Sequence, residues 1–538
     1  MSVDRSPNHP ARRSVLLGIA AAPFVAAATT CAAEAAPGRG RNYVVPQPRP
    51  GVYPTDPTTP KHELRAVWVS VVANIDWPSK TGLSAAAQQA ELIAWLDMAV
   101  AQRHNVVVLQ VRPTADALWP SRFEPWSAWL TGQQGENPGY DPLGFAVEEA
   151  HKRNLELHAW FNPFRVAMTE DPSTLIPTHP ARLHPEWAIP YGGKLYYNPG
   201  IPEVRHFIED AIMDAVERYD IDAVHFDDYF YPYPVAGKTF HDEEQYAEYG
   251  DGRSLADWRR SNIDDLILRL GRRIKRAKPL CQFGISPFAV WRNKATDPTG
   301  SDTTAGAQTY DDLYADTRGW VRKGWIDYIC PQIYWSIGFA AADYAKLVDW
   351  WSGVVQGTPV HLYVGQATYK VNTNGAVDAH WLNPGELSSH LEFNTKYPQV
   401  QGNIYFSAVP VRADELGATT LLNEKWYSRP ALLPVTPWLR HRTPARVTNV
   451  RRDGNSLQWQ SVSRDAAHFA IYRVPVKDHH SHAKSRDLAD ARYLAAVVPA
   501  QHHNRWTDAD NTSGSGTHVY VVSAVDRAGN ESAGVAVS

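Results

Sequence analysis

The sequence predicts an α/β protein: a (β/α)8 TIM barrel followed by a small all-β sandwich. Apolar runs typical of buried strands alternate with amphipathic stretches typical of helices over roughly 360 residues. Polar and acidic side chains gather just after the strand-like runs, where barrel enzymes carry their active sites. From residue 444 onward, the pattern changes to short alternating strands separated by Gly, Asn and Asp turns.

The predicted barrel spans residues 61–435. Its expected strands are apolar runs of the length that buried strands commonly have. They are Leu64 to Val71, Val106 to Val111, Glu156 to Phe161, Asp222 to Phe226, Gln282 to Pro287, Tyr328 to Ile333, His361 to Gly365 and Asn403 to Ser407. Amphipathic helices are expected between them, for example at Ala85 to Arg103, Pro202 to Tyr219, Ser254 to Lys278 and Ala341 to Val355.

Three further segments flank the barrel. Residues 1–36 are expected to be a twin-arginine-type signal peptide, because Arg12 and Arg13 precede an Ala-rich apolar run with a small-residue cleavage pattern. The Pro- and Gly-rich segment 37–60 is expected to be a linker. Residues 444–538 are expected to form the sandwich, and their closing run from Val522 to Ser532 resembles a fibronectin type III module.

Composition excludes several classes of partner. The 53 Lys and Arg residues nearly balance the 57 Asp and Glu residues, so we expect no nucleic-acid surface. No segment after the signal has the ~20 continuous apolar residues of a membrane span. The protein is therefore expected to be exported, either secreted or held at the cell wall, and to use no cofactor. Oligomeric state and the pairing of Cys281 with Cys330 stay open.

The most informative motif is the run from Asp222 to Tyr229, an expected strand that ends in two neighbouring carboxylates. Period two turns His225 and Asp227 toward the barrel interior. Asp227 is expected to be the charged catalytic carboxylate, and Arg112 and His225 are expected to keep it ionised by lowering its pKa.

A glycosidase also needs a carboxylic acid that protonates the leaving oxygen. Asp228, Asp116 and Asp76 are all placed near expected strand ends and are candidates for this role. For Asp116 and Asp76, a turn-forming role is equally well supported, since Asp at such positions commonly bonds its own backbone. The identity of the acid therefore stays open.

Further polar and aromatic side chains near the expected strand ends are candidates for sugar binding, because flat rings stack on sugars and polar groups orient them. They are Asp76, Trp77, Arg112, Trp119, His158, Trp160, Asn162, His225, Tyr229, Trp291, Asn293, Gln332, Tyr334 and Trp335. No metal site is expected, because an isolated His-x-Asp-Asp sequence lacks the three or four ligands of a stable site.

Several motifs in order resemble the glycosyl hydrolase-like 10 family, over about residues 62–430. They begin at Glu63 (ELRAVWV), Gln110 (QVRPTAD), His158 (HAWFNP), Asp222 (DAVHFDDY), Ser286 (SPFAVWRN) and Pro331 (PQIYW). The resemblance implies a secreted or envelope TIM-barrel glycoside hydrolase. It also implies bacterial cell-wall glycan as substrate class, particularly strands without peptides. Tyr229 stands where the similar chitinase pattern has its catalytic Glu, so the chitinase mechanism does not transfer directly, and Asp228 is one candidate to take over proton donation.

The leading interpretation is an exported glycoside hydrolase that cleaves a β-linked amino-sugar glycan by carboxylate acid/base chemistry. One alternative is a carbohydrate-binding barrel without catalysis. Another is a metal-dependent polysaccharide deacetylase or hydrolase that uses His225 with the two aspartates. The linkage, the endo or exo mode, and the retaining or inverting outcome stay open.

Overall fold

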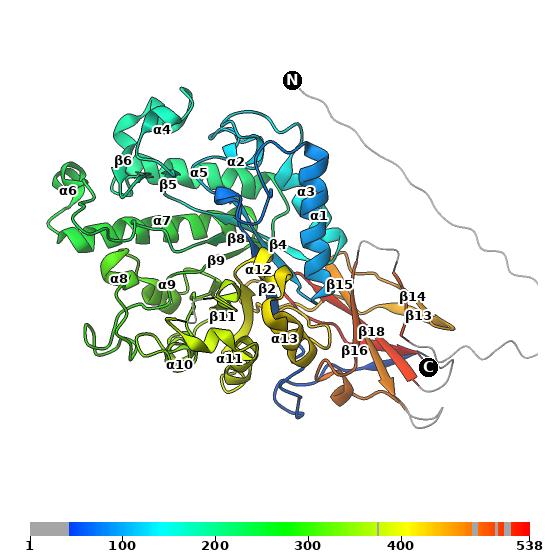
Figure 1. Ribbon diagram of the computed structural model, residues 1–538. Coiled ribbons are helices and arrows are strands. Elements are labelled where there is room, and N and C mark those ends of the chain that lie inside the picture. The colour runs from blue at the N-terminus through cyan, green and yellow to red at the C-terminus, as the bar shows by residue number, and fades with distance from the viewer. Residues whose placement is uncertain (1–41, 374–375, 476–481, 501–503, 511–517, 538) are drawn as a thin grey trace, which may run out of the picture. The chain divides into compact units, whose positions relative to one another are not determined.

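The computed structural model describes residues 42–373, 376–475, 482–500, 504–510 and 518–537, so the expected signal peptide lies outside the described residues. At its centre is a closed barrel of eight parallel strands (Figure 1), which confirms the predicted fold class. Its strands are β2 (Leu64–Val69), β3 (Val106–Arg112), β4 (Glu156–Phe161), β8 (Ala223–Phe226), β9 (Gln282–Ile285), β10 (Tyr328–Ile329), β11 (His361–Gln366) and β12 (Val400–Tyr405).

Helices follow the strands and cover the outside of the barrel. The longer ones are α1 (Ala85–Ala101), α3 (Pro142–Lys152), α5 (Pro202–Arg218), α7 (Leu255–Ala277), α10 (Tyr344–Val355), α11 (Glu386–Asn394) and α13 (Ala418–Trp426). The shorter ones are α2 (Ala128–Thr131), α4 (Pro180–Leu183), α6 (Glu243–Tyr249), α8 (Thr309–Asp312), α9 (Thr317–Lys323) and α12 (Ala408–Ala413). Side-chain caps fix several starts: Ser84 accepts from the Ala87 N–H of α1, and Ser254 accepts from the Asp257 N–H of α7.

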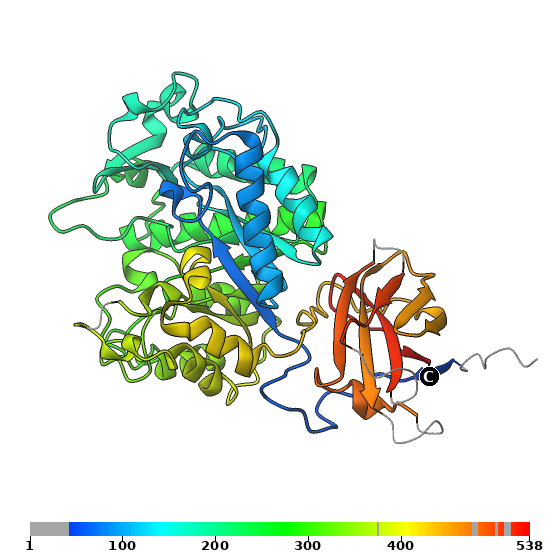
Figure 2. The ribbon, with the colours of Figure 1, turned by 45° about the vertical axis from the view of Figure 1, so that its right-hand side comes forward.

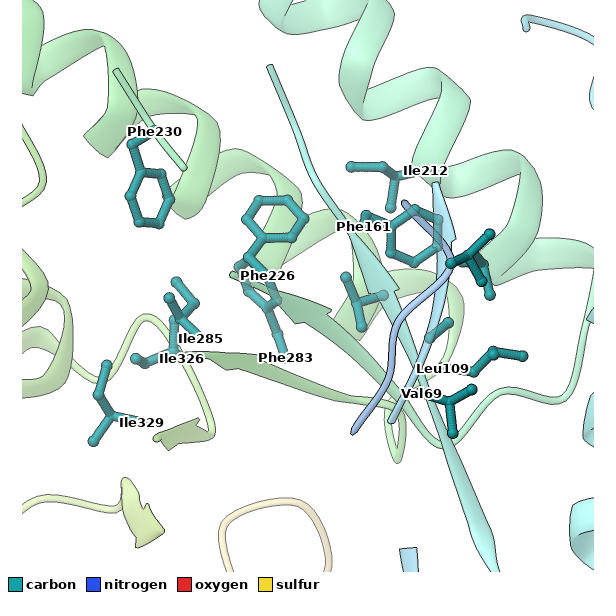
Figure 3. Close-up of a cluster of buried hydrophobic side chains, with 14 of the residues drawn as sticks. Val69, Leu109, Phe161, Ile212, Phe226, Phe230, Phe283, Ile285, Ile326 and Ile329 are labelled. Carbon is teal, nitrogen blue, oxygen red and sulfur yellow. The ribbon is translucent and has the colours of Figure 1, made fainter. Parts of the chain in front are cut away.

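Alternate residues of each barrel strand face different layers. On β3, Leu109 belongs to the layer between strands and helices, whereas Val108 belongs to the barrel interior. Figure 3 shows part of this outer layer, including Ile212 of α5 and the rings of Phe226 and Phe283 from neighbouring strands, whose centres are 5.2 Å apart. Because both faces of the strands are covered, the strands are apolar over most of their length.

The barrel interior is a packed core beside β9. The ring of Tyr328 occupies the space that a side chain at position 284 needs, and a Cβ on Gly284 would lie 1.9 Å from the Tyr328 Cζ atom. Only glycine therefore fits at this point. The Tyr328 hydroxyl reaches the inward-facing histidines His158 and His225.

An antiparallel sheet is inserted after β4, and the sequence analysis did not predict it. It consists of β5 (Arg165–Ala167), β6 (Ala188–Tyr191) and β7 (Lys194–Tyr197), in the order β5-β7-β6. Register is fixed by pairs such as Arg165 with Tyr196. The sheet matters for function because its first strand holds Arg165 beside the end of β4.

The C-terminal region is all-β, as expected, and its resemblance to a fibronectin type III module stays a prediction. One sheet contains β13 (Thr448–Asp453), β14 (Ser456–Gln460) and β17 (Arg505–Thr507). The other has the order β1 (Tyr43–Val45), β19 (Gly534–Val537), β18 (His518–Asp526), β15 (Ala466–Pro475) and β16 (Leu494–Pro499).

The segment expected to be a linker contributes one of these strands. Tyr43–Val45 pairs antiparallel with β19, and Figure 2 shows it in blue beside the red strands. Val45 is buried in the apolar cluster of this sheet, which gives the short Tyr-Val-Val run a reason to be ordered.

Two simpler findings complete the description. None of the helices within the described ranges is long and apolar enough to cross a bilayer. Cys281 and Cys330 are buried free thiols, so they do not form a disulfide with each other.

Candidate active site

A cavity of about 220 Å³ lies at the carboxyl ends of the barrel strands. Its wall combines aromatic rings with two carboxyl groups, one guanidinium, and amide and hydroxyl groups. The lining residues are Trp68, Ser70, Val72, Ile75, Gln110, Trp160, Arg165, Asp227, Asp228, Tyr229, Ser286, Gln332, Tyr334, Tyr369 and Phe406. This end of the fold is where TIM-barrel enzymes carry out their chemistry.

Asp227 is held by donors on both of its carboxylate oxygens. Oδ2 accepts from Trp160 Nε1 at 3.1 Å and from Asn162 Nδ2 at 2.9 Å, and Oδ1 accepts from the Tyr229 backbone N–H at 3.3 Å. Burial, and repulsion from Asp228 when that carboxyl is ionised as well, nevertheless raise the pKa of Asp227 to about 7. The expectation of a lowered pKa is therefore wrong, because burial outweighs the hydrogen bonds.

Asp228 lies beside Asp227 and has different partners. Its Oδ2 accepts from the Tyr233 hydroxyl, and its Oδ1 accepts from Gln332 Nε2 at 3.3 Å. Burial raises the pKa of Asp228 as well. Because two neighbouring carboxylates resist double ionisation, the pair titrates as a unit and passes through a state that holds one proton.

The hydrogen-bond partners decide where that proton resides. An indole, an amide NH₂ and a backbone N–H can only donate, so all three partners of Asp227 favour its carboxylate form. Asp228 also accepts from a donor-only group, Gln332 Nε2, but its other partner, the Tyr233 hydroxyl, can donate or accept, so Oδ2 of Asp228 can carry a proton. The geometry therefore assigns the charge to Asp227 and the proton to Asp228.

Arg112 does not line the cavity. Its guanidinium forms a buried ion pair with Glu124, with 2.5 Å between Nη2 and Oε1. It also donates to the backbone carbonyls of Asn162 at 2.5 Å and Pro163 at 3.0 Å. Arg112 thus holds the turn that carries Asn162, and it acts on Asp227 only through that turn.

His158 and His225 lie inside the barrel rather than in the cavity, and both are fully buried. His225 Nε2 accepts from Trp68 Nε1 at 3.1 Å, so its other nitrogen carries the hydrogen and faces the Tyr328 hydroxyl at 2.9 Å. His158 Nδ1 meets the same hydroxyl at 3.0 Å. Burial lowers the pKa of His225 well below its usual value. His225 is therefore neutral and supplies no charge to Asp227, which corrects the second part of that expectation.

Arg165 is the charged residue of the cavity lining that the sequence analysis did not predict. Its Nε and Nη2 donate to the Pro113 carbonyl at 3.2 and 3.1 Å, and its guanidinium lies 5.0 Å from the centre of the Tyr229 ring. Its positive charge acts to lower the pKa of both Asp227 and Asp228. The available signal was its position three residues after the Asn162 at a strand end, but its inward direction depends on the inserted sheet.

Trp77 and Trp119 are core residues and do not line the cavity. Both are fully buried, and each indole N–H is already used. Trp77 donates to the Gln88 carbonyl of α1 at 2.8 Å, and Trp119 donates to the Asp214 carboxylate of α5 at 2.9 Å. These side chains fasten loops to helices, so they are not available for stacking on a sugar.

Three further candidates also lie outside the cavity lining. Trp291 is nearly buried and donates to Asp316 at 3.1 Å, while Asn293 is held by the surrounding loop. Trp335 packs edge-on against Phe288, with 5.5 Å between the ring centres. By contrast, four of the predicted sugar-binding residues do line the cavity: Trp160, Tyr229, Gln332 and Tyr334.

Asp76 and Asp116 have structural partners. Asp76 accepts from the backbone N–H groups of Ser70 at 2.8 Å and Val409 at 2.9 Å, which ties the loop after β2 to α12. Asp116 is buried and accepts from the Thr114 N–H at 3.1 Å. Neither lines the cavity, so Asp227 and Asp228 are its two carboxyl groups.

Replacing Asp116 with asparagine is expected to change the pH dependence of stability. Burial raises the pKa of Asp116 to about 7, so the folded state binds its proton more tightly than the unfolded chain does. This group therefore lowers the free energy of unfolding as the pH rises from about 4 to about 7. Urea denaturation across this range should show a smaller loss in Asp116→Asn than in wild type, by no more than about 4 kcal/mol. Identical pH profiles for the two proteins would contradict the buried, titrating carboxyl.

Within the described ranges, no group of three or more His, Cys, Asp or Glu side chains is arranged to hold a metal ion. The residues that line the cavity suit acid/base chemistry on a polar substrate: two neighbouring carboxyl groups, one guanidinium and several aromatic rings.

Comparison with known proteins agrees with this description. The profile of the glycosyl hydrolase-like 10 family matches residues 63–383. The chain is 48% identical over 483 residues to "Glycosyl hydrolase YngK" of Bacillus subtilis, covering 87% of this chain and 92% of that protein. It is 41% identical over 391 residues to "Glycosyl hydrolase DigH" of Escherichia coli K12, covering 68% and 88%. Among solved structures, the PgaB (BpsB) glycoside hydrolase domain from Bordetella bronchiseptica aligns at 12% identity with a TM-score of 0.44, covering 68% of this chain and 99% of that one. The chain belongs to the glycosyl hydrolase-like 10 family and is a glycoside hydrolase.

Proposed function

We propose that the protein is an exported hydrolase of a β-linked amino-sugar glycan, and that its substrate is the peptidoglycan strand without peptides. The observation that supports this proposal best is the coupled pair Asp227 and Asp228 in an aromatic-lined cavity at the mouth of the barrel. Export is supported by Arg12-Arg13 and the apolar run that follows.

The two carboxyl groups divide the chemistry. Asp228 donates its proton to the glycosidic oxygen, so that the leaving sugar departs as an alcohol. Asp227 stays ionised, because its three partners only donate, and it stabilises the positive charge that develops at the anomeric carbon. Water then adds to that carbon and loses a proton, which replaces the proton that Asp228 gave to the leaving oxygen.

The rest of the cavity suits a sugar ring. Trp68, Trp160, Tyr229 and Tyr334 present aromatic surface, which packs against the C–H faces of pyranose rings. The indole of Trp68 is fixed in direction by its hydrogen bond to His225. A rigid aromatic wall positions the scissile bond at little entropic cost.

Product analysis tests the substrate. Purified protein is incubated separately with peptide-free peptidoglycan strands, with intact peptidoglycan and with chitin oligomers, and the products are identified by mass spectrometry. We expect short saccharides from the peptide-free strands, with markedly slower release from the other two polymers. The Asp227→Asn variant provides the blank, since it keeps the shape and removes the charge. Equal rates on chitin oligomers, or no release from peptide-free strands, would reject the proposed substrate.

A further inference from the structure

We propose that Arg165 forms a subsite for a carboxylate carried by the sugar itself, so that the enzyme selects glycan strands with free acidic groups. This inference rests on the proposed function and names the chemical feature by which the site recognises its substrate.

The guanidinium of Arg165 has a fixed orientation. Nε and Nη2 of Arg165 both donate to the Pro113 carbonyl, at 3.2 and 3.1 Å, which fixes the orientation of the group. The Arg165 guanidinium carbon also lies 5.0 Å from the centre of the Tyr229 ring. Nη1 makes no hydrogen bond to the described residues, and the guanidinium forms no ion pair with any described carboxylate. The anchored group thus retains donors for a ligand.

Arg165 is buried, with only 4% of its surface exposed, yet it lines the cavity. A buried arginine in a folded protein is normally paired with an acid, and the other buried arginine nearby, Arg112, is paired with Glu124. Arg165 forms no such ion pair with the carboxylates of the described residues, and a substrate carboxylate supplies one through charge-assisted hydrogen bonds to the guanidinium.

The positive charge of Arg165 offsets the negative charge of the aspartates in the cavity. A site with two aspartates repels an anionic glycan unless a positive charge offsets them. When the aspartate pair holds one proton, the positive charge of Arg165 balances the remaining carboxylate charge in the cavity. Among the residues that line the cavity, Arg165 is the cationic one.

The chemistry of the strand specifies the ligand. In a peptide-free peptidoglycan strand, the lactyl group on every second sugar ends in a free carboxylate. When the peptide is attached, the same carbonyl is an amide and carries no charge. Chitin has no such group. An arginine that binds this carboxylate therefore separates peptide-free strands from both alternatives.

The test uses one strand preparation in two forms, with its lactyl carboxylates free or converted to methylamides. kcat/KM on each form is measured for wild type, Arg165→Gln, Arg165→Lys and Arg292→Gln. For wild type, kcat/KM should be about 10- to 100-fold higher on the free-carboxylate form, which corresponds to the free energy of a hydrogen bond to a charged group. Arg165→Gln should lose this preference, and Arg165→Lys should keep part of it. Arg292→Gln is the matched control, because Arg292 pairs with Asp311 at 2.7 Å outside the cavity lining.

Several outcomes would overturn the subsite. A preference that persists in Arg165→Gln, or an equal loss on both strand forms, would show that Arg165 acts only on the aspartate pair. Equal cleavage of the two forms by wild type would remove the subsite and leave the proposed hydrolase intact. No cleavage of either form by wild type would reject the proposed substrate and the subsite together. If Arg165→Gln does not fold, the preference measured in Arg165→Lys against wild type decides.

Discussion

Asp228→Asn is expected to lower kcat on peptide-free strands by about 10²- to 10⁴-fold, the usual contribution of a general acid. Asparagine keeps the shape of the side chain and its contacts with Tyr233 and Gln332, but it cannot donate the proton. KM should change little, because the substitution removes an interaction made in the transition state. Initial rates at saturating strand concentration measure the effect.

The same substitution should also change Asp227. Repulsion between the two carboxylates, when both are ionised, contributes to the raised pKa of Asp227, so that pKa should fall in Asp228→Asn. Titration of the carboxyl carbons by NMR follows this shift directly. Asp116→Asn serves as control, because that carboxyl lies outside the cavity and the variant should retain wild-type kcat. Wild-type kcat in Asp228→Asn would instead move the role of acid to another group.

Gly284→Ala is expected to destabilise the fold by more than about 3 kcal/mol. The new methyl group would lie 1.9 Å from Cζ of the Tyr328 ring, and real Cβ atoms essentially never approach so closely. The ring cannot simply turn away, because its hydroxyl is held between His158 and His225 at 3.0 and 2.9 Å. Urea denaturation followed by tryptophan fluorescence measures the loss.

Gly353→Ala is the matched control for this change. Gly353 lies on the exposed side of α10, and a Cβ there meets no atom within 4 Å. Alanine should therefore stabilise the protein by up to about 1 kcal/mol through its helix propensity. A similar loss in both variants would show that the Tyr328 contact is not the cause.

The barrel could be predicted because its pattern is local. The expected strands at Val106 to Val111 and Glu156 to Phe161 agree with β3 and β4 to within one residue, since both faces of these strands are buried and apolar. The ends of α1 and α5 were similarly close. The alternation of a strand also placed His225 on the inward face, but it could not show how far along the barrel axis the side chain lies.

Most of the misplaced site residues lie in loops or at the wrong depth of the barrel. Trp77 and Trp119 follow strand ends, but their rings turn into the core, where Gln88 and Asp214 accept their N–H groups. His158 was expected to bind sugar, but it is fully buried inside the barrel and does not line the cavity. Arg165 shows the opposite error: it enters the cavity because a sheet with distant pairing brings it there. Such positions depend on contacts between remote segments, which periodicity does not report.

The pairing of β1 with β19 changes what counts as a separable module. A cut at residue 444 leaves the five-stranded sheet without the strand formed by Tyr43–Val45 and exposes the backbone edge of β19 to solvent. An open edge of this kind is a template for pairing with other chains. The terminal β domain is thus assembled from both ends of the described chain, and it cannot be transplanted into another protein as one continuous stretch without losing that strand.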